Sequence, residues 1–576
     1  MPPAAPWPAR DADHLLVTAA QMADLEAQLF ASGLPVEALM EKAALAISRR
    51  LLAEGVAGAA RLLAAGQAVL VLVGPGHNGG DGLVIARELH LAGIPVRIWS
   101  PFERHKPLTD AHLRHALWLG IPRLDSEPEP DDAGIWIDAL FGIGQSRAPG
   151  DQLEQLLEAR QSSRPRSLWA VDGPTGLCAD SGRLLGKGGA TAERTWSIGL
   201  LKRGFIQDAA LARVGQLERI DLGLPPALLS ALPEPTPVAL GAADAGSAPW
   251  PRADPAAAKY GRGRLLLVAG SRRFRGAAHL ALAGASASGC GSLRAALPQE
   301  LVDQLWMVHP EVVLAAELGA HPSGGLDLTP LASLDLSRLD AILLGPGLGG
   351  LELGGQDPGE LESEGLDALE ASLESEAQTW RRLQAFSGLL VLDADGLNRL
   401  AQRCQRAAGA AGPDGGGPNG GAGEGAAGWL GQRRGPTWIT PHRAEFARLF
   451  PALRDLEPLE AALEAARCSG ATVLLKGARS VVAAADGRRW QVLQAAPQAA
   501  RAGLGDGLAG YAAGRGAQAL ADPDRSRGEA DSGRLDDAAL LAAVALAHAQ
   551  AGLRCLDRRG PGGVSPQAVA AALQQS

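Results

Sequence analysis

The chain has few aromatic residues and few cysteines for its length. Phenylalanine, tryptophan and tyrosine make up 4% of the 576 residues, and the five cysteines are scattered without a C-x-x-C pair. This spacing argues against a disulfide framework or a cysteine zinc site, and it favours reduced thiols in a cytoplasmic protein. Glycine is abundant instead, with 74 residues, as in α/β proteins that have many strand-to-helix turns.

An excess of positive charge and a long hydrophobic run are also missing. The formal net charge is −9, which argues against nucleic-acid and anionic-membrane binding. No apolar run reaches about 18 residues, the length of a membrane span. The N-terminus, MPPAAPWPARDADHLL, lacks the basic and apolar regions of a signal peptide. We therefore expect a chain of two or more domains that binds neither nucleic acid nor a membrane.

The stretch Val69–Glu88 reads as a strand, a glycine-rich turn and a helix that begins near Asp81. Its G-x-G-x-x-G spacing is made by Gly74, Gly76 and Gly79. A carboxylate at the helix N-terminus would repel a pyrophosphate, so the loop favours a cation or a polar ring, unless Asp81 is only a helix cap. The next expected strand, Pro95–Ser100, lacks the acidic residue that binds a ribose in an ordinary NAD site.

Two further expected strands of this half each end in a carboxylate followed by a turn. They are Gly134–Asp138 and Leu168–Asp172. Ligands of open α/β sheets bind at the carboxyl ends of the strands. The sequence therefore predicts that Asp81, Asp138 and Asp172 belong to one site.

A second α/β pattern follows a stretch rich in proline and alanine. Asp506 stands in a G-x-G-D turn at an expected helix start, where backbone N–H groups bind anions. It could accept a proton from an attacking hydroxyl, while Lys476 and the turn after it hold nucleotide phosphates. His442 is a candidate substrate contact. No Walker motif is present, and Mg²⁺ is expected because phosphoryl transfer needs charge neutralisation.

Three segments of this half have no core pattern. Residues 351–377 are acidic, residues 407–428 are almost entirely glycine, alanine and proline, and residues 522–537 are polar. We expect all three to be solvated insertions without chemistry.

Short motifs occur in a fixed order along both halves. The N-terminal half contains LMEKA, GPGHNGGDG, DALFGIG, VDGPTG and GLLKRG. The C-terminal half contains VAGSRRFRGAA, HPE, GPGLG, LDADGLN, TPHRAEF, LLKGA and GLGDGLAG. The ordered set resembles the bifunctional NAD(P)H-hydrate repair enzymes over nearly the whole chain. The resemblance implies an α/β protein with a Rossmann-like N-terminal domain and a ribokinase-like C-terminal domain.

The resemblance also implies two activities. Residues 1–235 would be an epimerase that interconverts the R and S hydrates of NADH and NADPH (NADHX and NADPHX). Residues 236–258 would be a linker. Residues 259–576 would be a dehydratase that uses ADP to convert the S hydrate to NAD(P)H, with release of AMP and phosphate. Members of the family are expected to be homo-oligomers.

The site residues implied by the resemblance fall into four groups. The epimerase substrate would meet His77, Asn78, Gly79, Gly80, Asp81, Gly142, Ile143, Gly144, Gln145, Ser146, Arg147, Ala148 and Asp172, with Asp172 as the acid/base. Potassium would be held by Asn78, Asp138 and Thr175. The dehydratase substrate would meet Ala277, Gly347, His442 and Asp506, with Asp506 as the base. ADP would meet Lys476, Gly477, Ala478, Arg479, Ser480 and Gly505.

The chain departs from the family pattern at three of these motifs. His77 replaces an asparagine, Thr175 replaces a serine, and Leu504 replaces the serine or threonine of G-[ST]-G-D. The last change removes a hydroxyl near the phosphates, and we expect it to weaken ADP binding. Two alternatives to the dehydratase stay open. The C-terminal domain could be a ribokinase-like kinase of a small alcohol fused to a ligand-binding domain, or, because of Leu504, a catalytically weakened scaffold beside an active epimerase.

Overall fold

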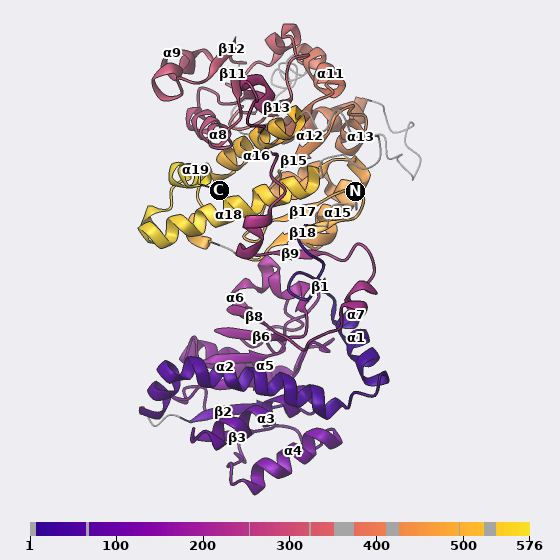
Figure 1. Ribbon diagram of the computed structural model, residues 1–576, viewed down its shortest axis with the longest axis vertical. Helices are drawn as coiled ribbons and strands as arrows, with labels where there is room; N and C mark the ends of the chain where they lie inside the picture. Colours follow the sequence, from indigo (N-terminus) through magenta and orange to yellow (C-terminus); the bar gives the residue numbers. More distant parts are fainter. Residues whose placement is uncertain are drawn as a thin grey trace. The chain divides into compact units, whose positions relative to one another are not determined.

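The computed structural model describes residues 7–64, 68–252, 254–321, 324–350, 374–410, 425–494, 496–522 and 537–575 (Figure 1). Two compact units divide the chain. One is Ala9–Ala239, and the other is Leu240–Ser576 together with Met1–Pro8. Each contains a sheet dominated by parallel strands, which confirms the predicted α/β fold in two parts.

The Ala9–Ala239 unit is built on a six-stranded parallel sheet of order β3-β2-β4-β5-β6-β8. Its strands are β2 (Val69–Val73), β3 (Val96–Trp99), β4 (Trp136–Ala139), β5 (Leu168–Val171), β6 (Arg194–Ile198) and β8 (Gln216–Ile220). A separate two-stranded ladder joins β1 (Leu16–Val17) to β7 (Leu201–Lys202). The central strand β2 is an apolar run buried on both faces, as expected when helices cover a parallel sheet, whereas the edge strand β8 is polar and mostly half-buried.

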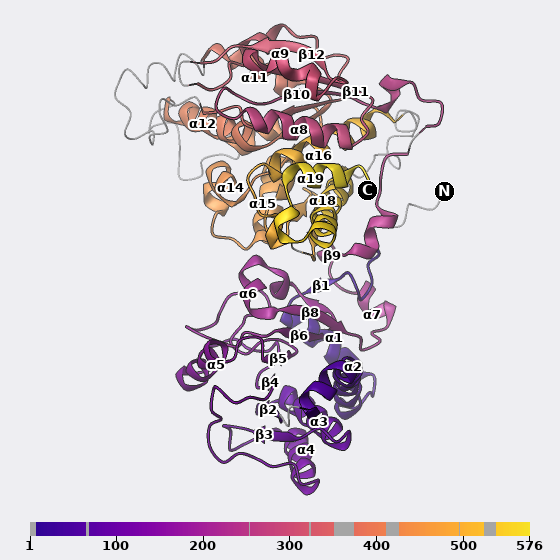
Figure 2. The ribbon, with the colours of Figure 1, turned by 90° about the vertical axis from the view of Figure 1, so that its left-hand side faces the viewer.

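Helices α2 and α3 pack together on this sheet (Figure 2). The helices of the unit are α1 (Ala19–Ala31), α2 (Val36–Ala64), α3 (His77–Leu91), α4 (Pro107–Trp118), α5 (Asp151–Ser163), α6 (Leu211–Val214) and α7 (Pro226–Ser230). The helix expected to begin near Asp81 begins at His77, because Gly76 already has the extended backbone of an N-cap. Asp81 therefore lies in the second turn, and the prediction that it stands at the helix N-terminus is wrong.

The second unit is built on a ten-stranded sheet of order β12-β11-β10-β13-β14-β15-β16-β17-β18-β9. The run from β12 to β16 is parallel, and β16, β17 and β18 pair antiparallel. The strands are β9 (Val238–Leu240), β10 (Arg264–Val268), β11 (Ser292–Pro298), β12 (Val313–Leu318), β13 (Ala341–Leu344), β14 (Leu389–Leu392), β15 (Thr437–Ile439), β16 (Thr472–Leu475), β17 (Val481–Ala483) and β18 (Arg489–Val492).

Helix α16 packs along α8 and beside α18 in this unit (Figures 1 and 2). Glycines permit the approach to α8, since a Cβ on Gly510 would collide with the Ala281 carbonyl. The helices are α8 (Arg275–Ala287), α9 (Gln299–Val308), α11 (Ala377–Ala385), α12 (Ala394–Ala410), α13 (Ala426–Gly431), α14 (Arg443–Leu449), α15 (Pro458–Ser469), α16 (Leu504–Ala521), α18 (Asp537–Arg559) and α19 (Pro566–Leu573).

The segment expected as a linker, residues 236–258, contains strand β9 at the edge of the larger sheet. The backbone N–H of Leu493 donates to the Leu240 carbonyl there, a pairing that local composition cannot reveal. Most of each expected insertion lies outside the described residues, but Glu376, near the end of the first one, is fully buried and paired with Arg399, so the expectation of a solvated segment is wrong there. Of the described helices, only α18 is long and apolar enough to cross a membrane, and most of it is buried in the fold.

Candidate functional sites

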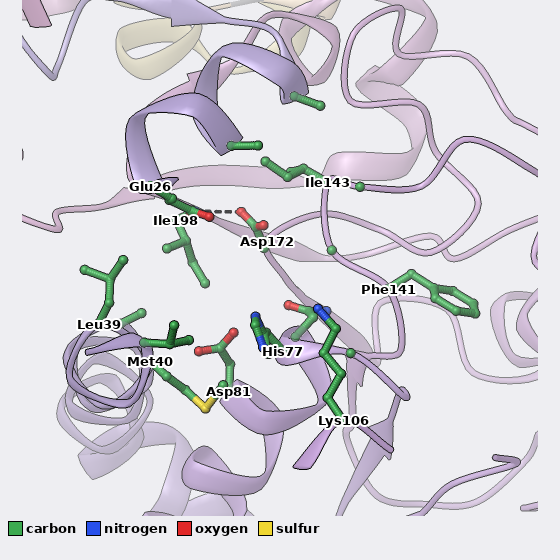
Figure 3. Close-up of a pocket in the computed structure, with 18 of the residues that line it drawn as sticks. Glu26, Leu39, Met40, His77, Asp81, Lys106, Phe141, Ile143, Asp172 and Ile198 are labelled. Carbon is green, nitrogen blue, oxygen red and sulfur yellow. Dashed lines mark hydrogen bonds between the residues drawn. The ribbon is translucent and has the colours of Figure 1, made fainter. Parts of the chain in front are cut away.

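A cavity of about 430 Å³ opens in the Ala9–Ala239 unit where β2, β4 and β5 end. Residues from α1 and α2 line it on one side, and the loops after the three strands line it on the other (Figure 3). Eight residues implied by the sequence line this cavity: His77, Asn78, Asp81, Gly142, Ile143, Gly144, Gln145 and Asp172. Residues that follow three different strands, and that the sequence grouped into one site, thus line one cavity.

The other five implied residues do not line the cavity. Gly79 and Gly80 lie inside α3, where a Cβ on Gly79 would collide with the Gly74 carbonyl and one on Gly80 would meet the Met40 side chain. The remaining three, Ser146, Arg147 and Ala148, follow Gln145 on the loop after β4. The two glycines thus act by letting α3 approach its neighbours.

Asp172 directly follows β5 and has a left-handed backbone, with φ of 57°. Its Oδ1 atom accepts hydrogen bonds from the Lys202 ammonium at 2.8 Å and from the Ile198 backbone N–H at 3.1 Å. Lys202 is fully buried, and pairing of β7 with β1 fixes its place. A strained residue with a buried lysine partner is the kind of feature that folds keep at functional sites.

Three carboxyl groups, from Glu26, Asp81 and Asp172, point into this one cavity (Figure 3). Burial and the nearby Asp172 charge raise the pKa of Glu26 to about 7. Burial, Asp172 and Glu26 raise the pKa of Asp81 well above its usual value. Like charges in a confined apolar space disfavour ionisation, so part of this cluster holds protons near neutral pH.

Glu26 and Lys202 were missed by the sequence reasoning. Lys202 lies in the motif GLLKRG, which was used for the resemblance but given no role. Glu26 lies on α1, where the residues nearby in sequence suggest only an amphipathic helix. Its exposure to the cavity together with Ala23 and Phe30, at helical spacing, becomes visible only in the fold.

The implied potassium ligands carry side-chain oxygen atoms on three elements: Asn78 in the first turn of α3, Asp138 in β4, and Thr175 on the loop after β5. Asp138 is fully buried and accepts hydrogen bonds from the Thr175 backbone N–H at 2.8 Å and hydroxyl at 2.7 Å. Burial raises its pKa to about 6. Among the described residues, the Asn78 amide oxygen and nitrogen are buried without a hydrogen-bond partner. A buried, unsatisfied amide points to a missing ligand.

A second cluster surrounds Lys476, which directly follows β16. Its ammonium lies 2.6 Å from Asp393 Oδ1 and 3.9 Å from Glu445 Oε2. These two carboxylates hold the pKa of Lys476 above its usual value despite burial. Asp506, in the first turn of α16, belongs to the same charged group. Burial and the Asp393 charge raise the pKa of Asp506 to about 7, a value suited to a general base.

The other residues implied for the dehydratase substrate are His442, Ala277 and Gly347. His442 caps α14, where its Nδ1 accepts from two backbone N–H groups, and its backbone pairs with Lys476. Its side chain is 52% exposed, which leaves the ring open to a ligand. Ala277 and Gly347 face one another closely, and a Cβ on Gly347 would meet the Ala277 methyl group.

A cavity of about 280 Å³ lies beside the Lys476 cluster, and Gly477, the residue after Lys476, is part of its lining. Of the six implied ADP residues, Gly477, Ala478 and Ser480 line it, and so does Leu504. Gly505 faces Lys476 instead, since a Cβ there would lie 3.3 Å from the ammonium. The backbone of Arg479 accepts from Gln491 at 3.3 Å. His548, which the sequence did not indicate, is half-buried and lines this cavity, and desolvation lowers its pKa to about 4.

Comparison with known proteins decides the family. Residues 36–204 match the family described as YjeF-related protein N-terminus, and residues 265–575 match NAD(P)H-hydrate dehydratase. The chain is 38% identical over 557 residues to a Synechocystis protein named bifunctional NAD(P)H-hydrate repair enzyme Nnr, covering 96% of this chain and 93% of that protein. The chain belongs to the bifunctional NAD(P)H-hydrate repair enzymes. The motif resemblance is therefore confirmed.

A second relative and a solved structure are also similar to parts of this chain. The protein of the same name from Gloeobacter violaceus is 40% identical and covers 86% of this chain and 87% of its own length. A solved structure of the ADP/ATP-dependent NAD(P)H-hydrate dehydratase from Bacillus subtilis is also similar, with 22% identity and a TM-score of 0.40 over 58% of this chain and 95% of that one.

Proposed function

We propose that this chain repairs hydrated nicotinamide cofactors by two activities, an epimerase in residues 1–235 and an ADP-dependent dehydratase in residues 259–576. The observation that carries the proposal is that each unit has its own cavity, lined by the residues that the family motifs supply. The first eight residues are an exception to this division, since Trp7 hydrogen-bonds to Asp244 and Trp490 of the second unit.

For the epimerase, Asp172 acts as the acid/base on the hydrated ring. The hydrate bears a hydroxyl on C6, next to the ring nitrogen N1. Lys202 has no exposed surface and donates to Asp172, Ser197 and the Ile198 carbonyl, so it holds the Asp172 carboxyl group in place. Asp81 and Asn78 line the same cavity and supply polar contacts for the nicotinamide end.

A potassium ion fits Asn78, Asp138 and Thr175. All three offer neutral or anionic oxygen atoms, which hard cations prefer, and the Asn78 amide is buried without a partner among the described residues. Bound there, the ion would supply positive charge next to the substrate loops. It would also favour the ionised form of Asp138, whose pKa burial raises.

For the dehydratase, Asp506 takes the proton of the C6 hydroxyl as its oxygen attacks the β-phosphorus of ADP, and AMP leaves. Phosphate is then a good leaving group from C6, and loss of a proton from C5 restores the dihydropyridine ring. Lys476, which lies within the carboxylate cluster, contacts the diphosphate of ADP. Mg²⁺ fits here because Asp393, Glu445 and Asp506 make the cluster net negative, and the ion would neutralise the diphosphate.

We also propose a homo-oligomer in the cytoplasm. The five cysteines are free, which suits a reducing compartment. On α9, Trp306 is 70% and Met307 60% exposed, and the neighbouring strand β12 is an unpaired sheet edge that exposes Val313. Large exposed apolar groups beside a sheet edge favour association of copies. Light scattering after size exclusion is expected to give a multiple of the chain mass, and a single-chain mass would contradict it.

A spectrophotometric assay tests the two activities together. A mixture of R and S NADHX is incubated with the protein and ADP, and the return of the NADH absorbance band is followed. Full recovery, faster than uncatalysed epimerisation, is expected. Recovery of only the S fraction would leave the dehydratase alone. No recovery, with R and S still interconverted, would favour the scaffold alternative that the Leu504 substitution raised.

A further inference from the structure

Epimerisation at C6 moves two protons at different atoms. If the ring opens, a base removes the hydroxyl proton, the C6–N1 electron pair moves to N1, and N1 receives a proton. C6 is then an aldehyde carbon. Closure on the opposite face of that carbon reverses each transfer, so no proton is consumed overall. One base near O6 and one acid near N1 are therefore needed.

Asp172 can serve only one of these positions as a base. Its Oδ1 is occupied by Lys202 and by the Ile198 N–H, while Oδ2 lies toward the loop at Gly142, where a Cβ would be 3.2 Å away. Lys202 cannot be the acid, because its ammonium donates to Asp172, Ser197 and the Ile198 carbonyl and is fully buried. The acid must come from another wall of the cavity.

Glu26 lies on that other wall. It projects from α1 on the cavity side, and Figure 3 shows its carboxyl group and that of Asp172 pointing toward one another. The helix is anchored independently of Glu26, since Met22 and Leu25 are buried in the core and Thr18 caps it. Packing therefore does not explain an acidic group at this position.

We propose that Glu26 is a second catalytic residue of the epimerase, donating a proton to N1 while Asp172 takes the proton from the C6 hydroxyl. On closure, the Glu26 carboxylate takes the N1 proton back, and Asp172 returns its proton to the carbonyl oxygen. The assignment rests on the proposed epimerase function. Residue Glu26 lies outside the residues 36–204 that match the N-terminal family.

The electrostatics of the cavity separate the two roles. Lys202 donates a hydrogen bond to Asp172, whereas Glu26 lies near Asp172 and Asp81, two acidic groups. The pKa of Glu26 is raised to about 7 for this reason. A carboxyl group that still holds its proton near neutral pH suits the role of the acid.

The test compares Glu26→Gln, Glu26→Asp and the control Asp24→Asn, an exposed acid on the same helix. Exchange between R and S NADHX is followed by chromatography without ADP, and ADP-dependent dehydration of the S hydrate reports on the intact protein. We expect kcat for exchange to fall about 100-fold or more in Glu26→Gln. The KM and the dehydration rate stay unchanged, Glu26→Asp keeps part of the rate, and Asp24→Asn keeps all of it.

The pH profile separates catalysis from structure. In the wild type, kcat for exchange is expected to decline as pH rises above about 7, because Glu26 loses its proton, and Glu26→Gln loses this limb. If Glu26→Gln kept the wild-type rate and pH profile, the catalytic role of Glu26 would be overturned, while the proposed epimerase function would stand. Equal losses in all three variants, with lowered melting temperature, would overturn it in favour of a structural role. A wild-type protein without exchange would overturn both this role and the proposed epimerase.

Discussion

At the scale of single residues, each of the two sites contains a carboxyl group that hydrogen-bonds to a lysine. Asp172 with Lys202, and Asp393 with Lys476, are the two pairs. In each site a further carboxyl group, Glu26 or Asp506, lies near the pair and has a pKa raised to about 7. In each site the lysine holds one carboxyl group by a hydrogen bond. The raised pKa of the neighbouring carboxyl group suits that group to proton exchange near neutral pH.

Asp506→Asn is expected to lower ADP-dependent dehydration about 100-fold or more, since a general base contributes factors of that order. As a base Asp506 must be ionised, and its pKa is about 7. The wild-type kcat is therefore expected to fall about tenfold per pH unit below pH 7 and to level off above it. Steady-state kinetics between about pH 5.5 and about pH 8.5 measure this pH dependence of kcat. An undiminished rate in Asp506→Asn would exclude Asp506 as the base.

Leu504→Ser is expected to lower the KM for ADP several-fold. Leu504 lines the second cavity at the first position of α16, where a hydroxyl would add a donor toward the phosphates. One added hydrogen bond to a charged group is worth about 1.5–3 kcal/mol at most. Leu504→Ala serves as the control, because it removes the same bulk without adding a hydroxyl. A KM that falls equally in both variants would mean that bulk, not the missing hydroxyl, limits ADP binding.

Local sequence predicted the residues that follow strands, and it missed the ones that depend on distant packing. The apolar runs before Asp138 and Asp172 predicted strands, and β4 and β5 are found there. Glu26 could not be assigned, because its neighbours in the cavity come from β5 and α3, far along the chain. Asp81 was misplaced because three glycines and an asparagine at a helix start look like a turn.

At the scale of the elements, the capping of α1 holds Glu26 in the cavity. Thr18 Oγ1 accepts from the Gln21 N–H, and the Gln21 side chain accepts from the Thr18 N–H. Such a capping box satisfies two helix N–H groups, and loss of its N-cap residue costs about 1 kcal/mol.

Thr18→Ala is therefore expected to destabilise the N-terminal unit by about 1 kcal/mol and to lower epimerase activity more than dehydratase activity. Calorimetry and the two separate assays measure these effects. Thr18→Ser keeps the hydroxyl and is the matched control. A loss of dehydratase activity as large as the loss of epimerase activity would contradict a local role for this cap.

The close contact of α16 with α8 sets the position of Asp506 in the same way. A Cβ on Gly510 would collide with the Ala281 carbonyl, whereas Gly276, exposed on α8, has open space around its Cβ position. Gly510→Ala is expected to cost about 1–3 kcal/mol through overpacking and to lower dehydratase activity. Gly276→Ala is expected to leave both unchanged. Equal melting temperatures for the two variants would show that the helix contact tolerates an added methyl group.

The sheet edge at β9 shows where local reasoning about elements fails. A three-residue strand between prolines has no period to read, and only its pairing in the larger sheet identifies it. Parallel strands such as β2 and β13 were predictable because each is a continuous apolar run bounded by turn residues, whereas β11 and β12, which contain Arg294 and Glu317, were not predicted.

At the scale of the whole molecule, one chain carries two separate cavities, one in each compact unit. Under the proposed function the dehydratase acts on the S hydrate, so the R hydrate reaches NAD(P)H only after epimerisation. We therefore expect the two activities to act in series on one substrate pool, and we expect a substitution in one site to remove one activity without the other.

The most direct test is the recovery of NADH from an equal mixture of R and S NADHX with ADP, compared between the wild type and Asp172→Asn. The wild type is expected to return all of the hydrate, in a fast phase for S and a second phase for R. Asp172→Asn is expected to keep the fast phase and lose the catalysed second phase. Full recovery by Asp172→Asn at the wild-type rate, or no recovery by the wild type, would contradict the account.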